Sequence, residues 1–150
     1  MLRWLHKRQG AQSLVEFAII VPLFMIFVFG IIDFGFGLKA YISVTQATRE
    51  GARYASIGNP SGGPYTSCTA ATPTTVIGKV CTTMSGVRQS DIQSITVNCN
   101  PSCASGNTVS VASSYHYHYI TPIKAIITFF SGGSMPDYLT VSSSTDMRLE

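Results

Sequence analysis

The longest apolar run in the chain lies close to its N-terminus and predicts a membrane-length helix. Phe17–Ile32 contains no charged side chain, and apolar residues extend the run on both sides. At a rise of about 1.5 Å per residue, such a run can cross a bilayer core about 30 Å thick. The pattern then becomes amphipathic, until Gly58 and Pro60 end it. We therefore predict one helix over about Ser13–Ile57, with an apolar first half and an amphipathic second half.

Small residues recur at every fourth position in the amphipathic half of this predicted helix. They form what we call the small-residue stripe: Ser43, Ala47, Gly51 and Ala55. A spacing of four places them on one face of a helix, and small side chains there let another element approach closely. A helix packed on a sheet of the same chain explains the stripe.

The rest of the chain predicts short elements of both kinds. Residues 58–72 are rich in Gly, Ser, Thr and Pro and predict a loop. Helix-stop signals, alternation and β-branched residues then predict a series of elements: a helix over Pro73–Met84 with Pro73 in its first turn, a strand over Ile92–Asn98, a turn-rich connection over 100–107, a strand over Thr108–Ile120, a helix over Pro122–Phe130 and a strand over Leu139–Leu149. The fold class is therefore α+β, with the long helix packed on a small antiparallel sheet of three or four strands.

The net charge of +3 is confined to the N-terminal end. Arg3, Lys7 and Arg8 account for all of it, because the rest of the chain carries equal numbers of acidic and basic side chains. The chain thus has no basic face for nucleic acid. Its basic flank instead predicts a cytoplasmic N-terminus and an extracytoplasmic remainder, since positive residues stay inside.

Glu16 directly precedes the uncharged segment Phe17–Ile32. A charged side chain that enters hydrocarbon costs roughly 2.5–3.5 kcal/mol on insertion scales, so it is usually retained for a function. A plain membrane anchor has no use for such a carboxylate. A cleaved secretory signal peptide is a further alternative, but its apolar region spans about 7–15 residues and precedes a small-residue cleavage site. This run is longer, and no Ala-x-Ala sequence follows it closely.

Four cysteines follow the predicted membrane span, at Cys68, Cys81, Cys99 and Cys103. An even number in an exported segment indicates two disulfides, for which three pairings are possible. Cys99 and Cys103 enclose a tight turn, which favours 99–103 together with 68–81. Their spacing differs from that of a zinc site, which uses closely spaced Cys or His pairs.

The sequence Tyr115–Tyr119 alternates tyrosine and histidine. On a strand, His116 and His118 share one face and the three tyrosines share the other. Two imidazoles could hold a metal, but no carboxylate or cysteine lies near them, so a solvated histidine face over a tyrosine core is favoured. The sequence also lacks a Gly-x-Ser-x-Gly elbow and a phosphate-binding Walker motif. We therefore expect no catalytic residue, cofactor or metal.

Glu50 and Arg53 lie three residues apart on the predicted helix, with Arg49 beside them. An ion pair at this spacing contributes about 0.2–0.5 kcal/mol. A surface pair is the simplest interpretation. Contacts of these residues with the sheet or with a neighbouring subunit are the alternative.

Three sequence blocks, in order, resemble the TadE-like family. These blocks are Gln9–Ala18, Gly30–Gly35 and Ala47–Ala55. The family comprises pseudopilins or minor pilins of the tight-adherence (Tad, or Flp) branch of type IV pilus systems. The resemblance is close over about the first 57 residues and weaker at Pro122 and at Met147–Glu150, while residues 58–120 show none.

The resemblance implies a pilin-like subunit with three segments. Residues 1–11 would be a basic leader, 12–38 the transmembrane half of the helix and 39–150 an extracytoplasmic α+β domain. A membrane-embedded aspartyl prepilin peptidase would remove the leader, and Glu16 would then meet the new amine of a neighbouring subunit. The expected partners are the cytoplasmic (inner) membrane, this peptidase and other pilin or pseudopilin subunits.

The same resemblance places the processing site at Gly10, Ala11 and Gln12. In the usual type IV pattern the glutamate is the fifth residue of the mature chain. Cleavage after Gly10 would make Glu16 the sixth residue, whereas cleavage after Ala11 makes it the fifth, so we favour the Ala11–Gln12 bond. The alternative function is an unprocessed, single-pass anchored domain that binds or senses a ligand outside the cytoplasm.

Overall fold

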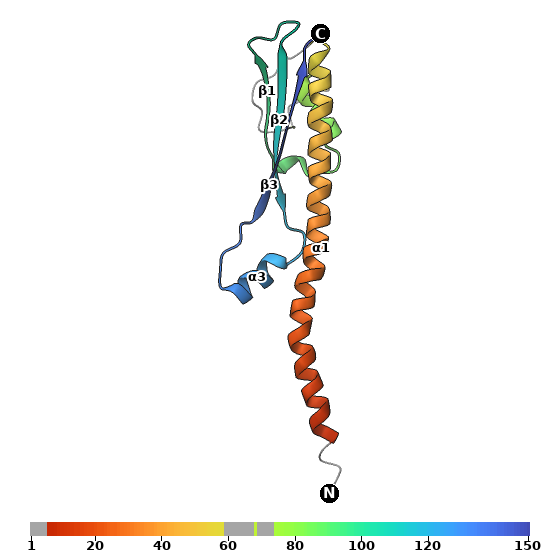
Figure 1. Cartoon of the computed structure of the whole chain (residues 1–150), viewed down its shortest axis with the longest axis vertical. Coiled ribbons are helices and arrows are strands. Elements are labelled where there is room, and N and C mark those ends of the chain that lie inside the picture. Colours follow the sequence, from red (N-terminus) through yellow and green to blue (C-terminus); the bar gives the residue numbers. More distant parts are fainter. Residues whose placement is uncertain (1–5, 59–67, 69–73) are drawn as a thin grey trace. The chain divides into compact units, whose positions relative to one another are not determined.

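In the computed structural model of the chain, residues 6–58, 68 and 74–150 are described, with residues 6–11 described by their backbone alone. The elements follow one another as expected from the sequence (Figure 1): α1 His6–Ser56, α2 Val76–Thr83, the 3₁₀ helix η1 Gln89–Asp91, β1 Ile92–Asn100, β2 Thr108–His118, α3 Ile123–Ser131 and β3 Tyr138–Arg148. A long helix packed on a three-stranded antiparallel sheet confirms the predicted α+β class.

The long helix α1 begins earlier than the sequence pattern indicated. It starts at His6 instead of about Ser13, and it continues through Pro22. The residues before Ser13 include Lys, Arg, Gln and Ala, which are strong helix formers, and Gly10 alone costs only about 1 kcal/mol. No cap or proline stops the helix there, so it extends into the basic segment.

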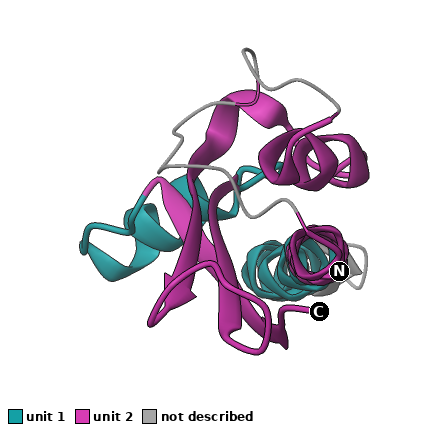
Figure 2. Ribbon diagram, turned by 90° about the horizontal axis from the view of Figure 1, so that it is seen from above, with its two compact units in different colours: residues 1–35, 119–136 teal, residues 36–118, 137–150 magenta. Residues whose placement is uncertain are grey.

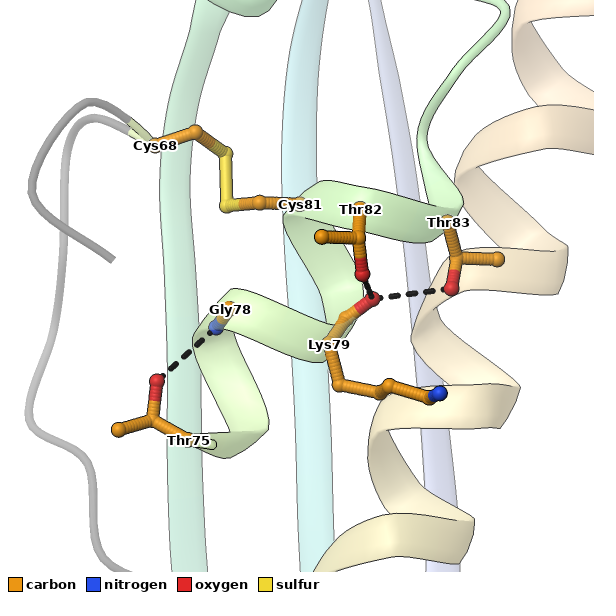
Figure 3. The surroundings of a disulfide bond; sticks show 7 residues. All are labelled: Cys68, Thr75, Gly78, Lys79, Cys81, Thr82 and Thr83. Carbon is orange, nitrogen blue, oxygen red and sulfur yellow. Dashed lines mark hydrogen bonds between the residues drawn. A yellow bond between two sulfur atoms is a disulfide. The ribbon is translucent and has the colours of Figure 1, made fainter. Parts of the chain in front are cut away.

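The helix α2 begins later than predicted. It starts at Val76, not at Pro73, which lies outside the described residues. The Thr75 hydroxyl accepts a hydrogen bond from the Gly78 amide at 3.1 Å and caps the helix (Figure 3). A threonine cap satisfies a backbone donor that has no partner within the first turn, and this local hydrogen bond sets the start of α2.

Contacts divide the chain into two compact units, which Figure 2 colours separately. The first unit combines Met1–Gly35 with Tyr119–Pro136, so it holds the apolar half of α1 together with α3. The second unit combines Phe36–His118 with Asp137–Glu150 and holds the rest of α1, α2 and the sheet. The sequence pattern did not predict that the segment around α3 groups with the N-terminal helix half.

Within the second unit, the sheet has the order β1-β2-β3, with both strand pairs antiparallel. The register sets Val97 opposite Val111 and Tyr115 opposite Val141, so apolar residues of all three strands share one face. The amphipathic half of α1 runs along the sheet (Figure 1), and the Thr48 and Ser113 hydroxyls lie 2.6 Å apart. Both groups are buried, so their hydrogen bond satisfies polar atoms inside the core.

Two disulfides join the four cysteines, and they follow the pairing that the sequence favoured. Cys68 bonds to Cys81 of α2 (Figure 3), and Cys99 at the end of β1 bonds to Cys103 in the following turn. The described part of the chain therefore holds no free cysteine. The 68–81 bond spans 13 residues, and closing a loop of about this length stabilises a fold by about 3 kcal/mol in the chain-entropy account.

Candidate membrane and assembly site

The apolar half of α1 exposes large hydrophobic side chains all around its surface. Leu14, Phe17 and Ile31 are 69%, 68% and 72% exposed. The helix is long and apolar enough to cross a membrane. A helix that is apolar on every side needs an apolar surrounding, because water does not solvate such a surface favourably. The N-terminal helix is therefore a single-pass membrane anchor.

Glu16 lies on this exposed part of α1. Among the described residues its carboxylate makes no ion pair. The residues between Glu16 and Asp33 carry no charge and span about 24 Å of helix. The two carboxylates thus bracket the apolar segment, and their surroundings differ.

Asp33 is buried, with only 6% of its surface exposed. One carboxylate oxygen accepts hydrogen bonds from the backbone amides of Ile120 and Thr121, at 2.8 and 3.3 Å. The other oxygen accepts a hydrogen bond from the Thr121 hydroxyl. Asp33 therefore ties the chain just before α3 to the N-terminal helix, within the first unit.

This arrangement satisfies a carboxylate that is costly to remove from water. Hydrogen bonds to an ionised acceptor are worth about 1.5–3 kcal/mol, and three donors converge on Asp33. The sequence reasoning missed this residue, although the signal was present. Asp33 is an acid inside an apolar helix, as Glu16 is, and the same argument from insertion cost applies to it.

Replacing Asp33 with alanine should loosen the segment before α3, because two backbone amides lose their acceptor. Hydrogen bonds to a charged acceptor are worth about 1.5–3 kcal/mol, so amide hydrogen exchange at Ile120 and Thr121 should accelerate about tenfold to hundredfold. Asp33→Asn should exchange more slowly than Asp33→Ala, because it keeps one carbonyl oxygen. Exchange measured in detergent tests this prediction.

The control for Asp33 is an acid that faces solvent in the other unit. Asp146 on β3 is exposed, and Asp146→Ala should leave the exchange of these two amides unchanged. Equal protection of Ile120 in wild type and Asp33→Ala would contradict the assigned role of Asp33.

The small-residue stripe is used inside the second unit. Ala47 and Ala55 are fully buried, and Gly51 is also buried, whereas Ser43 is partly exposed. A Cβ atom at Gly51 would lie 2.3 Å from Cγ2 of Val80 in α2 and 3.5 Å from Cγ1 of Val111 in β2. The close approach of α2 therefore explains why this position has no side chain. Packing within the chain accounts for the small side chains at Ala47, Gly51 and Ala55.

Glu50 and Arg53 form the predicted ion pair on α1. Two nitrogens of the Arg53 guanidinium donate to the two carboxylate oxygens at 2.8 and 2.9 Å, and Lys79 Nζ lies 3.8 Å from Glu50. The hydrogen bond from Arg53 lowers the pKa of Glu50 below its ordinary value. The pair therefore stabilises the fold at neutral pH and is lost as the pH falls through this lowered pKa. Both side chains are partly exposed, so this contribution is small.

The two histidines of β2 contact the ring of Tyr138 on β3. The His116 ring stacks on Tyr138 with centroids 3.8 Å apart, and His118 meets the edge of the same tyrosine at 5.8 Å. On the opposite face, Tyr115 and Tyr117 are buried. Within the described part of the chain, no three His, Cys, Asp or Glu side chains gather in a way that could hold a metal.

The residues of the expected processing site lie near the beginning of α1. Gly10, Ala11 and Gln12 are all in helical backbone. Side chains are described only from Gln12 onward, so the recognition surface of this segment stays a sequence prediction.

Comparison with known families identifies the N-terminal part of the chain. The family model described as TadE-like protein matches residues 11–53, which confirms the resemblance drawn from the three sequence blocks. The match covers most of α1, including Glu16, Asp33 and Gly51. The match indicates a Tad pilus-associated protein. No curated protein and no solved structure matches the chain.

Proposed function

We propose that this protein is a minor pilin or pseudopilin of a Tad-type pilus or secretion apparatus. The observation that carries the proposal is the coincidence of two features. Residues 11–53 match the TadE-like family, and the same helix exposes an apolar surface that begins beside the carboxylate of Glu16. A pilin-type subunit needs both features, because the helix is first held by lipid and then by the helices of neighbouring subunits.

In this proposal, the basic leader stays in the cytoplasm and the folded domain lies outside it. Residues 1–11 are the leader, 12–38 span the membrane and 39–150 face the extracytoplasmic side. The two disulfides support this orientation, since disulfides form and persist in oxidising compartments. The basic residues Arg3, Lys7 and Arg8 support it independently.

A prepilin peptidase then cuts the chain between Ala11 and Gln12, and Glu16 becomes the fifth residue of the mature subunit. Neighbouring pilin or pseudopilin subunits are the next partners. The new α-amino group and Glu16 carry opposite charges at the mouth of the apolar helix. In surroundings of low dielectric constant, such charges attract strongly.

The cleavage is tested by N-terminal sequencing and intact mass of the protein recovered from membranes, with and without a co-expressed prepilin peptidase. We expect a mature chain that begins at Gln12 only when the peptidase is present. Ala11→Leu should block cleavage, because a bulky side chain replaces the small one at the scissile bond.

Ala18→Leu is the matched control for Ala11→Leu, because it makes the same change within the span and should leave cleavage intact. A chain that still begins at Met1 in the presence of the peptidase would favour the unprocessed, anchored binding or sensing domain. A chain that begins after Phe17 would favour a secreted domain with a cleaved signal peptide.

A further inference from the structure

The helix α3 exposes an aromatic pair. Phe129 is 83% exposed and Phe130 is 61% exposed, and their rings meet edge to face with centroids 5.3 Å apart. Ile120, just before the helix, is 60% exposed. Large apolar side chains grouped in this way are unusual on a surface that meets only water, and they mark a contact with another molecule or with a membrane.

The opposite side of α3 faces the N-terminal helix within the first unit. Ile123 is buried, and its Cδ1 atom lies 3.7 Å from the position that a Cβ of Gly30 would take. The hydrogen bonds to Asp33 hold Ile120 and Thr121 at the same level. The start of α3 is therefore fixed beside Gly30–Asp33 of α1.

This level lies close to the extracytoplasmic end of the proposed span, residues 12–38. The uncharged segment between Glu16 and Asp33 is about 24 Å long, slightly shorter than a hydrocarbon core of about 30 Å. If Glu16 marks one boundary of this core, Asp33 lies close to the other. The start of α3, joined to Asp33, then lies at the boundary between acyl chains and headgroups.

We propose that α3 is an interfacial membrane helix that inserts Phe129 and Phe130 into the lipid at the Asp33 end of the span. Such helices bury an apolar face about 5–10 Å into the boundary between headgroups and acyl chains. α3 contains no acidic residue, and Lys124 is its one charged side chain. Lysine suits this depth because its long stem lets the ammonium group reach the headgroups.

Lipid is the favoured occupant because the apolar surface of α3 belongs to the same unit as the lipid-facing half of α1. The inference needs the membrane anchor but not the pilus role, so each can fail without the other. If the inference is right, two elements bind the subunit to the membrane, the apolar half of α1 and α3. Both must leave the lipid when the subunit is extracted.

The test places a single tryptophan at the tip of α3. The full chain carries Phe129→Trp in a Trp4→Phe background, since Trp4 is the natural tryptophan. It is reconstituted in phosphatidylcholine vesicles, in which some lipids carry bromine on the acyl chain near the headgroup. The matched control is Ile57→Trp, at a position in the second unit that is 65% exposed and follows the end of α1.

We expect brominated lipid to quench the fluorescence of Phe129→Trp at least threefold more than that of Ile57→Trp. Quenching equal to that of the control would overturn the proposal. Weak quenching would overturn the proposal even if the emission of Phe129→Trp is shifted to shorter wavelength. In that case a second subunit, and not lipid, covers the indole.

Discussion

Replacing Glu16 with leucine should leave the protein in the membrane and remove it from the assembled fibre or assembly complex. Insertion improves because a charge that costs roughly 2.5–3.5 kcal/mol is gone. Under the proposed function, the loss occurs because the amine of the neighbouring subunit is left without its partner. Leaving one member of a buried pair uncompensated costs about 3–5 kcal/mol, which corresponds to a more than hundredfold loss of subunit affinity at 1.4 kcal/mol per tenfold change.

The measurement compares membrane level, processing and recovery in sheared fibres for each variant. Glu16→Gln matches the size of glutamate without its charge, so it should fail like Glu16→Leu. Val15→Leu changes an adjacent exposed residue without touching charge and should assemble normally. If Glu16→Leu enters fibres as well as the wild type does, the carboxylate has no role in assembly.

Replacing Gly51 with alanine should destabilise the second unit by about 1–3 kcal/mol, the usual cost of overpacking. In a helix, alanine is more favourable than glycine by about 1 kcal/mol. At this position, however, the Cβ of alanine would clash with Cγ2 of Val80. Valine is stiff about its first torsion, so the clash is relieved only if the α2 backbone moves. The thermal midpoint should fall by about 4–8 °C for each kcal/mol lost in a domain of this size.

Thermal unfolding in detergent measures this effect, and the same helix supplies the control. A Cβ at Gly37 would lie 3.8 Å from the Tyr117 ring, an ordinary contact, so Gly37→Ala should be neutral or slightly stabilising. The double variant Gly51→Ala, Val80→Ala should lose less stability than the sum of the two single variants, because Val80→Ala removes the clashing methyl group. An unchanged midpoint in Gly51→Ala would show that α2 does not pack on α1 as described.

Much of this fold follows from local patterns in the sequence. Period and length predict α1, and alternation predicts the three strands to within a few residues. The tight spacing of Cys99 and Cys103 correctly favoured a local bond. These features depend on residues close together in the chain, where geometry leaves few alternatives.

The features that the sequence did not predict depend on contacts between distant residues. Asp33 and Ile120 are 87 residues apart along the chain, and no periodicity indicates that they meet. The grouping of residues 119–136 with the N-terminal half of α1 likewise depends on contacts between residues far apart in the chain. The small-residue stripe was recognised, but its neighbour remained open, because a smooth helix face fits a strand, another helix or a second molecule equally well.

The packing of α2 on the stripe limits where other subunits can contact this part of α1. A helix has a finite circumference, and the side formed by Ala47, Gly51 and Ala55 is already covered. If the subunit enters a fibre as proposed, any fibre contact made by the amphipathic half must use the side that remains exposed, where Tyr41 and Ile42 are 50% and 47% exposed. Under the proposed function, the amphipathic half of α1 would have one side for folding and another for polymerisation, and a substitution on one side need not disturb the other.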